Sequence, residues 1–498
     1  MGMSESPNNP VRTRFAPSPT GYLHVGNIRT GFFAWLVARH AGGKFILRLE
    51  DTDKKREVQG ADEHLIACLK ALGVEWDEGF DIGGPFSPYR QSERLDHYKT
   101  WAQKLIDTGR AYADPYTAEE VQAFREQAQK AKQPFLYRNH RPENPPTWDG
   151  SQPLRFKSEP KAYTWHDEVM GELSTGPEVI DDFILIKSDG YPTYNFAHIV
   201  DDAEMEISHI IRGQEFIAST PNYLNLYEAL GVTPPILATM PHILGEGGNK
   251  KLSKRDGAKD VLDYIRQGYL PEALTNFIAS LGWNDGSEQE IFSRDELIAN
   301  FSLDRVQKSG ARFDERRLLW MNGSYIRQLP LDELYDMTRT VALPTGVASE
   351  ADRQSYWPPE SAEYDDAYRK QVLGLVQERL KYLAELPELS LFFFKDLPVD
   401  TALISTHKQL KKLSGQELHD LLQQAKTSLQ DSDFSTDDLS KRLNQLLEVS
   451  GQKPAVLFSL IRIATTQSPS SPGLAESLAV LGKERSLSRI DSQLAALR

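Results

Sequence analysis

Two stretches far apart in the chain carry residues that suit the binding of phosphate groups. The first, residues 11–27, reads V-R-T-R-F-A-P-S-P-T-G-Y-L-H-V-G-N. It begins with an alternating strand pattern, continues as a loop fixed by two prolines and a glycine, and opens onto helical spacing after Gly26. A helix start presents unpaired N–H groups and positive potential, and His24 adds a hydrogen-bond donor. This stretch therefore predicts an anion site at a helix N-terminus.

The second stretch, residues 245–257, combines glycines with the four cations Lys250, Lys251, Lys254 and Arg255. It follows a strand-like run over residues 236–244. A mobile basic loop of this kind can close on phosphates, although the same composition also fits a solvated basic turn.

Charged side chains also stand where predicted strands end. The run K-F-I-L-R-L at residues 44–49 reads as a strand and leads into Glu50, and Arg212 ends a second strand-like run, I-S-H-I-I-R. Parallel sheets bind ligands at the carboxyl ends of their strands. Thr52 or Asp53 is also suited to cap the following helix, and both interpretations can hold together.

Composition limits the class of protein. A chain of 498 residues should form two to four domains, and 40% hydrophobic with 26% charged residues is ordinary for a globular protein. The net charge of −14 disfavours a polyanionic partner only weakly, because local basic strips, such as Lys408 with Lys411 and Lys412, can hold one. Cys68 is the only cysteine, which excludes an internal disulfide and any cysteine-based zinc site and favours a cytoplasmic setting. No apolar run approaches the roughly 20 residues of a membrane span.

The spacing of apolar residues changes along the chain. From about Arg94 a helical pattern leads into a polar segment, a proline-rich segment and short strand-like runs. Asp189-Gly190 is a turn signal between two expected strands, residues 183–186 and 191–196, and the changed pattern indicates an inserted domain. Beyond residue 263 helical periods dominate, and the last 170 residues are polar, leucine-rich and helix-like.

The two stretches suited to phosphate binding, residues 11–27 and 245–257, resemble two known sequence signatures that follow each other in the same order. His24-Val25-Gly26-Asn27 resembles the HIGH element of class I aminoacyl-tRNA synthetases, with Asn27 in place of the last histidine, and K-L-S-K-R at 251–255 resembles their KMSKS element. Together with L-R-L-E-D-T-D, D-G-Y-P-T-Y-N-F-A and I-I-R-G-Q-E-F, the chain resembles bacterial glutamyl-tRNA synthetases through about residue 330. The likeness beyond that point is weaker and rests on L-G-K-E-R at 481–485.

The resemblance implies an α/β fold with a doubly wound, Rossmann-type catalytic domain, an inserted α+β domain, and helical stem-contact and anticodon-binding domains. The expected boundaries are residues 11–93 and 191–257 for the catalytic halves, 94–190 for the inserted acceptor-binding domain, 258–330 for the stem-contact domain and 331–498 for the anticodon-binding domain.

The resemblance also implies ATP-dependent ligation of L-glutamate to tRNA-Glu through a glutamyl-adenylate, with Mg²⁺ brought by ATP. Whether tRNA-Gln is a second partner stays open, and a cytoplasmic monomer without a membrane or a resident metal is expected. The residues expected to hold the phosphates and assist the reaction are His24, Lys251 and Lys254. Those expected to bind the amino acid are Arg14, Phe15, Ala16, Ser18, Glu50, Tyr194, Asn195, His198 and Arg212. The remaining residues expected around ATP are Gly26, Asn27, Glu215, Leu244, Ser253 and Arg255.

Three alternatives stay open. A glutamyl-queuosine tRNA synthetase shares the catalytic core but lacks the C-terminal domain, and a small-molecule nucleotidylyltransferase would not need 498 residues. A non-enzymatic tRNA-binding protein should have lost the cationic loop that this chain keeps.

Overall fold

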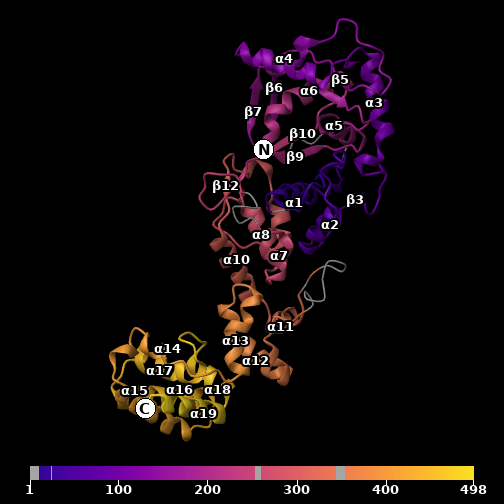
Figure 1. The fold of residues 1–498 in the computed structure, drawn as a ribbon. Coiled ribbons are helices and arrows are strands. Elements are labelled where there is room, and N and C mark those ends of the chain that lie inside the picture. Colours follow the sequence, from indigo (N-terminus) through magenta and orange to yellow (C-terminus); the bar gives the residue numbers. More distant parts are fainter. Residues whose placement is uncertain (1–9, 24, 253–258, 342, 344–353, 498) are drawn as a thin grey trace. The chain divides into compact units, whose positions relative to one another are not determined.

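The computed structural model describes residues 10–23, 25–252, 259–341, 343 and 354–497. The chain divides into two compact units, one made of residues 1–264 and 271–318 and the other of residues 265–270 and 319–498 (Figure 1). None of the described helices is long and apolar enough to cross a membrane.

A parallel sheet forms the centre of the first unit. Its strands β1 (Arg12–Phe15), β2 (Lys44–Leu47) and β3 (Glu78–Gly79) lie side by side in that order. Parallel neighbours need a crossover, which α1 (Val25–His40) and α2 (Ala61–Ala71) supply. The strand, loop and helix predicted for residues 11–27 are therefore confirmed for the residues that the structure describes.

The chain returns to the free side of β1 after a long excursion. Strand β9 (His209–Gly213) pairs in parallel with β10 (Ile236–Met240), and the backbone N–H of Ser208 donates to the carbonyl of Arg12 at 2.9 Å. Strand order thus reverses between β1 and β9, and the crevice at such a reversal is where doubly wound sheets bind ligands. The predicted doubly wound fold is confirmed.

Helix α1 packs on β1, β2 and β9 and is buried along most of its length. Its close approach to β1 depends on Gly31, because a Cβ atom there would lie 2.8 Å from the ring of Phe15. Absence of a side chain at Gly31 therefore fixes how near the helix start comes to the loop after β1.

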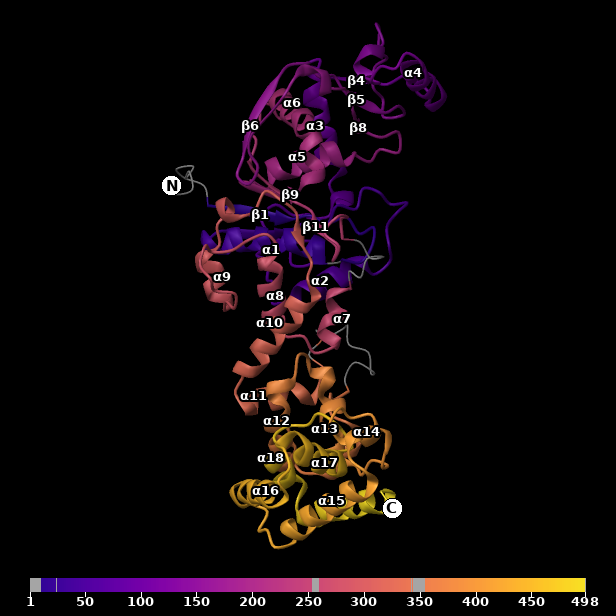
Figure 2. The same ribbon diagram turned by 90° about the vertical axis from the view of Figure 1, so that its left-hand side faces the viewer.

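The excursion between β3 and β9 contains helices and antiparallel strands. Strands β4, β5 and β8 form one antiparallel sheet (Figure 2). The β6–β7 hairpin joins the edge of β10. The elements are α3 (Leu95–Asp107), β4 (Ala111–Ala113), α4 (Ala118–Lys130), β5 (Leu154–Phe156), β6 (Tyr163–Asp167), β7 (Gly171–Thr175), β8 (Ile184–Ile186), α5 (Tyr194–Glu204) and, beyond β9, α6 (Thr220–Leu230).

Two local expectations are wrong. Thr52 and Asp53 do not cap the next helix, because α2 begins only at Ala61 after Gly60, whose φ of 78° suits glycine. The turn at Asp189-Gly190 exists, with Lys187 N–H donating to the Tyr191 carbonyl, but residues 194–196 continue as helix α5 rather than as a strand.

The remaining elements of the chain are mostly helical. They are β11 (Ile243–Leu244), α7 (Val261–Arg266), α8 (Pro271–Ser280), α9 (Arg294–Asn300), β12 (Ala311–Arg312), α10 (Glu315–Gln328), α11 (Leu331–Arg339), α12 (Asp366–Val376), α13 (Leu386–Phe394), α14 (Ala402–Ser405), α15 (Gly415–Gln430), α16 (Thr436–Ser450), α17 (Pro454–Thr466), α18 (Leu474–Leu481) and α19 (Lys483–Ala496).

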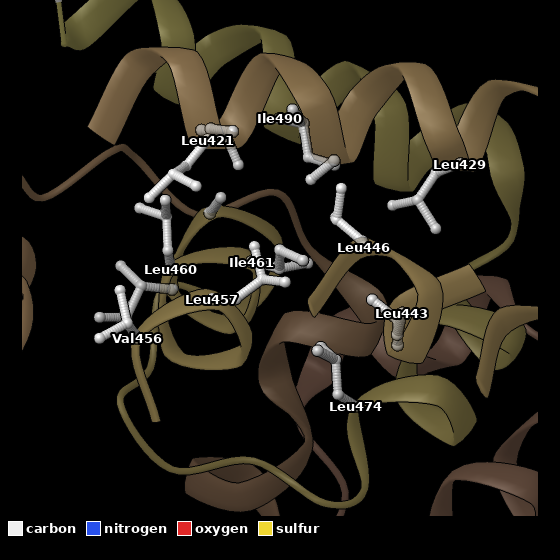
Figure 3. Packing of buried hydrophobic residues seen from close by; sticks show 14 of the residues in the cluster. Leu421, Leu429, Leu443, Leu446, Val456, Leu457, Leu460, Ile461, Leu474 and Ile490 are labelled. Atoms are coloured by element: carbon white, nitrogen blue, oxygen red, sulfur yellow. The ribbon is translucent and has the colours of Figure 1, made fainter. Parts of the chain in front are cut away.

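The second unit is held by a leucine-rich core. Side chains from α15, α16 and α17, such as Leu429, Leu443 and Leu457, are almost completely buried together with Ile490 of α19 (Figure 3). Helix α15 starts with a capping box in which Ser414 accepts from the N–H of Glu417. The prediction that this part of the chain is helical is confirmed for its described residues.

Candidate active site

A cavity of about 530 Å³ opens at the carboxyl ends of β1 and β9. Its walls come from the loop after β1, the first turns of α1, Glu50 three residues beyond β2, the start of α5, the end of β9 with the residues after it, and the segment from β10 to Leu252. Segments distant in sequence therefore meet in one site at the reversal of strand order.

One end of the cavity is built for anions. Gly26 and Asn27 of the α1 N-terminus line it, and so does Lys251 of the basic loop. Arg29, one turn into α1, is buried against the carbonyls of Leu281 and Pro241, and burial lowers its pKa to about 10, a value at which it remains protonated near neutral pH. These cations and the helix start together favour phosphate groups.

Glu215 faces this cationic end. Its carboxylate lies 3.7 Å from Lys251 Nζ and 3.8 Å from His242 Nδ1. Burial, together with the charge of Lys251, lowers the pKa of His242, so this imidazole is neutral near pH 7. Glu215 therefore orients Lys251, while His242 adds a hydrogen-bonding group without charge.

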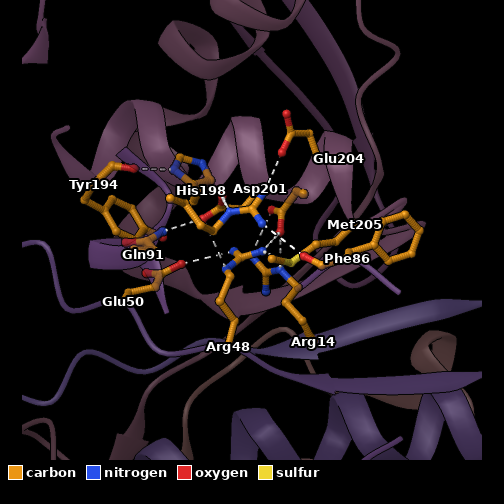
Figure 4. Close-up of polar contacts among 12 residues, drawn as sticks. Arg14, Arg48, Glu50, Phe86, Gln91, Tyr194, His198, Asp201, Glu204 and Met205 are labelled. Carbon is orange, nitrogen blue, oxygen red and sulfur yellow. Dashed lines mark hydrogen bonds and ion pairs between the residues drawn. The ribbon is translucent and has the colours of Figure 1, made fainter. Parts of the chain in front are cut away.

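A buried ionic network supports the other end (Figure 4). Asp202 accepts from Arg14 Nε at 3.1 Å and Nη2 at 3.3 Å, and from Arg48 Nη1 at 2.8 Å. Arg48 Nη2 donates to Glu50 at 3.1 Å. Burial alone would raise the pKa of Asp202, but Arg14 and Arg48 lower it to about 2.

For Glu50, the effect of burial on the pKa outweighs the effect of the neighbouring arginines. Burial raises its pKa to about 7, and Arg48 and Arg14 offset this only in part. Glu50 lines the cavity, so a cation placed beside it would favour the ionised carboxylate. The arrangement suits an ammonium group.

Arg212 is a buried cation of the cavity wall. It is 6% exposed, and its Nη2 donates to the Thr220 hydroxyl at 2.7 Å. Among the residues that the structure describes, no carboxylate forms an ion pair with it, and its Nε has no hydrogen-bond partner. Burial lowers the pKa of Arg212, so a carboxylate ligand would supply the missing counter-charge.

Aromatic rings form the wall beside these arginines. The ring of Tyr194 stacks on His198 at 4.7 Å and on Phe216 at 5.3 Å, and Arg212 lies over the rings of Phe216 and Tyr223. His198 Nδ1 lies 2.7 Å from the Tyr194 carbonyl and therefore carries the proton. Burial lowers the pKa of His198 to about 3, so this ring is neutral and holds Tyr194 in place.

The structure brings most of the expected site residues into the cavity wall. Those that line it are Arg14, Phe15, Ala16, Ser18, Gly26, Asn27, Glu50, Tyr194, Arg212, Glu215 and Lys251. Three others are not among its described lining residues: Asn195 accepts from the Tyr223 hydroxyl, His198 lies behind Tyr194, and Leu244 pairs with the β12 segment. The expectations for His24, Ser253, Lys254 and Arg255 fall outside the described residues.

Sequence reasoning missed Arg29, Arg48 and Asp202. Arg48 interrupts an otherwise apolar strand pattern, and Asp201-Asp202 interrupts a helix whose other residues are mostly apolar. A single charged residue within a run of apolar residues is a signal that could have identified them, since a buried charge needs an oppositely charged partner. The identity of those partners could come only from the fold.

The comparisons with known proteins agree with this geometry. The family described as "tRNA synthetases class I (E and Q), catalytic domain" matches residues 10–320, and the family described as "Anticodon binding domain" matches residues 334–494. The second match removes the alternative that lacks a C-terminal domain.

Full-length relatives are similar throughout. A glutamate–tRNA ligase of Dehalococcoides mccartyi is 41% identical over 493 residues, covering 98% of each chain. One from Bacillus licheniformis is 39% identical over 496 residues, covering 97% of this chain and 99% of the relative. The crystal structure of a glutamate tRNA ligase from Elizabethkingia meningosepticum in complex with its amino acid matches with a TM-score of 0.84 and 31% identity, covering 98% of this chain and 100% of that one.

The fold and cavity are those of a class I aminoacyl-tRNA synthetase. Within that class, the chain belongs to the glutamate–tRNA ligase family.

Proposed function

We infer that this chain ligates L-glutamate to the 3′ end of tRNA-Glu in two steps. ATP and glutamate first form a glutamyl-adenylate and pyrophosphate, and the tRNA then accepts the glutamyl group with release of AMP. The observation that carries this inference is one cavity with Arg212, Arg14 and Glu50 at one end and the α1 start with Arg29 and Lys251 at the other.

The amino-acid end matches the charges of glutamate. The substrate carries two carboxylates and one ammonium, and this end of the cavity offers Arg14, Arg212 and Glu50. Arg212 has donors left for a carboxylate, whereas Arg14 has already committed two nitrogens to Asp202. We assign the γ-carboxylate to Arg14 and the α-carboxylate to Arg212, with Tyr194 beside them and Ala16 and Ser18 completing the wall.

Activation requires alignment and charge neutralisation rather than a nucleophilic side chain. A carboxylate oxygen of glutamate attacks the α-phosphorus while the bond to pyrophosphate breaks, so negative charge grows on the leaving group. The α1 N-terminus with His24 would hold the phosphates, and Lys251 and Lys254 would meet the pyrophosphate. Gly26, Asn27, Glu215, Leu244, Ser253 and Arg255 complete the assigned ATP site.

Mg²⁺ is proposed only as a companion of ATP. The two carboxylates among the described lining residues, Glu50 and Glu215, already face Arg48 and Lys251. This donor set does not fit a protein-held magnesium ion, so no step is derived through one.

The rest of the chain is assigned to tRNA. Residues 94–190 would bind the acceptor end, residues 258–330 the stem and residues 331–498 the anticodon. We propose that the enzyme acts as a monomer. We also propose a cytoplasmic location, since the single cysteine, Cys68, allows no disulfide within the chain.

ATP–pyrophosphate exchange tests the first step, and it should be measured with glutamate in the presence and in the absence of tRNA. Exchange that depends on glutamate, followed by aminoacylation of tRNA-Glu, supports the proposal. Absence of exchange under both conditions would contradict it. Charging of tRNA-Gln by the same preparation would extend the range of tRNA partners.

A further inference from the structure

A second cluster of polar donors lies outside the cavity wall, between α2 and the start of α7. It consists of His64, Cys68 and Asp260, whose ligand atoms all lie within 4.8 Å of one another. We propose that these three side chains form a binding site for a thiophilic divalent cation of the Zn²⁺ class. The proposal is independent of the function proposed above.

The two ligands on α2 are placed by helix geometry. His64 and Cys68 are four residues apart, so they lie one turn apart on the same face of α2. Cys68 Sγ lies 3.6 Å from His64 Nδ1 and 3.7 Å from Nε2. A rigid helix therefore presents a thiol and an imidazole together.

Asp260 completes the set from a different segment. Its Oδ1 accepts from the N–H of Leu262, which caps the start of α7, and its Oδ2 lies 2.6 Å from His64 Nε2. The distance from Cys68 Sγ to Asp260 Oδ1 is 4.0 Å. Because the helix cap fixes Asp260, the third ligand is also held in place before any ion arrives.

These distances are close to what a tetrahedral ion needs. Zn–S, Zn–N and Zn–O bonds of roughly 2.3, 2.0 and 2.1 Å place ligand atoms about 3.3–3.6 Å apart. The contact of Cys68 Sγ with the His64 ring already has that spacing. The His64–Asp260 pair must widen from 2.6 Å, and the Cys68–Asp260 pair must close from 4.0 Å. One thiolate, one imidazole and one carboxylate suit Zn²⁺, and water would fill the fourth position.

The three side chains of the cluster differ in exposure, and the two that are partly exposed leave a path for an ion. Cys68 is fully buried, whereas the side chains of His64 and Asp260 are 14% and 21% exposed. The ring of Tyr22 lies 4.6 Å from that of His64 and is itself 47% exposed. An ion can thus reach the two partly exposed ligands first and then the thiol.

This conclusion revises the exclusion drawn from composition. A single cysteine rules out a Cys-rich zinc site but not a site that uses one thiolate with histidine and aspartate. The competing explanation is that the His64–Asp260 contact is only a hydrogen bond that ties α2 to α7. The two explanations differ in whether the chain binds metal through sulfur.

Cobalt spectroscopy separates them sharply, because Cys68 is the only thiol among 498 residues. The full-length, chelator-treated chain is titrated with Co²⁺ and followed by thiolate-to-cobalt charge-transfer absorption, and Zn²⁺ is then added in competition. We expect one equivalent of Co²⁺ to bind with this absorption and Zn²⁺ to displace it. Zn²⁺ should also raise the melting temperature in a concentration-dependent manner.

The variant Cys68→Ser should lose the charge-transfer absorption and the Zn²⁺-dependent shift in melting temperature. His64→Gln and Asp260→Asn retain the thiol and should weaken Co²⁺ binding by more than the roughly 10–100-fold that loss of an outer-shell partner costs. His166→Ala is the matched control, since His166 forms a surface pair with Glu172 at 2.7 Å. A wild-type chain without sulfur-to-cobalt absorption, or absorption unchanged in His64→Gln and Asp260→Asn, would overturn the proposal.

Discussion

Asp202 holds Arg14 through two hydrogen bonds, from Nε at 3.1 Å and from Nη2 at 3.3 Å, across 188 residues of sequence. Arg14 is therefore an oriented guanidinium whose charge is partly compensated before substrate arrives. Arg212, 6% exposed, has no ion-pair partner among the described residues. Arg14 and Arg212, the two arginines at the amino-acid end of the cavity, thus differ in how strongly each needs a substrate carboxylate.

The first prediction concerns the choice between glutamate and glutamine. Arginine offers only donors, so it binds a carboxylate at both oxygens but meets an amide donor to donor. Arg14→Gln should lower kcat/KM for glutamate on the order of 10²-fold, the loss of one charged hydrogen bond of about 1.5–3 kcal/mol, and should reduce the preference over glutamine. Arg212→Gln should lower kcat/KM for both amino acids alike.

Steady-state kinetics with both amino acids measure these effects, and Arg39→Gln, a partly exposed arginine paired with Asp77, serves as the control. An Arg14→Gln enzyme that keeps the parent's full preference for glutamate would place the selectivity elsewhere in the pocket.

The second prediction concerns pH. Since burial raises the pKa of Glu50 to about 7, its carboxylate becomes protonated as pH falls through 7 and loses its attraction for the substrate ammonium. The Kd for glutamate should therefore rise between pH 7.5 and 6, roughly in proportion to the protonated fraction. Because the pKa in the folded chain lies above the unfolded value, Glu50 also lowers stability progressively as pH rises from about 4.5 to 7.

Calorimetric titration with glutamate across this range checks the binding effect, with Glu50→Gln as the comparison. The variant should bind weakly at every pH and show a flat profile. An equally steep profile in Glu50→Gln would mean that another group titrates.

The third prediction concerns Lys254. Its removal takes away a cation proposed to meet charge that develops only in the transition state. Lys254→Ala should lower kcat for activation on the order of 10²–10³-fold with little change in the melting temperature. ATP–pyrophosphate exchange, measured with tRNA present, gives kcat and KM separately. A rise in KM for ATP with kcat unchanged would show uniform binding instead and would falsify the assigned role.

The fourth prediction concerns tRNA. If local basic strips hold the tRNA despite the net charge of −14, log affinity should fall with log salt by about 0.7–0.9 per phosphate neutralised. Lys411→Gln, at an exposed lysine of the second unit, should reduce that slope, whereas Lys426→Gln, whose lysine pairs with Asp491, should not. Filter binding at several salt concentrations measures the slope. An affinity that does not change with salt would contradict electrostatic binding.

The fifth prediction concerns the buried network. Arg48→Met leaves Asp202 and Glu50 without a shared partner, and breaking a buried pair in this way costs about 3–5 kcal/mol. The denaturation midpoint of the first unit should fall accordingly, and KM for glutamate should rise because Glu50 loses its orientation. Adding Asp202→Asn to Arg48→Met should restore part of the stability, because it removes the charge that Arg48 had compensated. A double variant no more stable than Arg48→Met would argue against coupling between Arg48 and Asp202.

Local features of the sequence were sufficient to predict much of the site. The strand, the proline-fixed loop and the helix of residues 11–27 follow from neighbouring residues, and so does the placement of Glu50 and Arg212 at strand ends. The helical second unit likewise follows from its leucine spacing.

Other features depend on contacts that the sequence does not reveal. The bond between Arg48 and Asp202 spans 154 residues, so no local pattern could pair them. His198 carries hydrogen-bonding groups that suggest a ligand contact, yet its ring lies behind Tyr194 because helix α5 turns it inward. The late start of α2 was missed because Thr52 and Asp53 are good capping residues whose backbone does not enter the helix.

The backbone contact between Ser208 and Arg12 has a consequence for the order of synthesis. These residues are 196 positions apart, and at about 5–20 residues per second the ribosome needs roughly 10–40 s to pass from one to the other. During that interval the nascent β1 has a partner on one side only, and an unpaired strand edge invites association with other chains. The growing chain can close this edge of β1 only after β9 has been synthesised, and only then can the cavity hold a substrate.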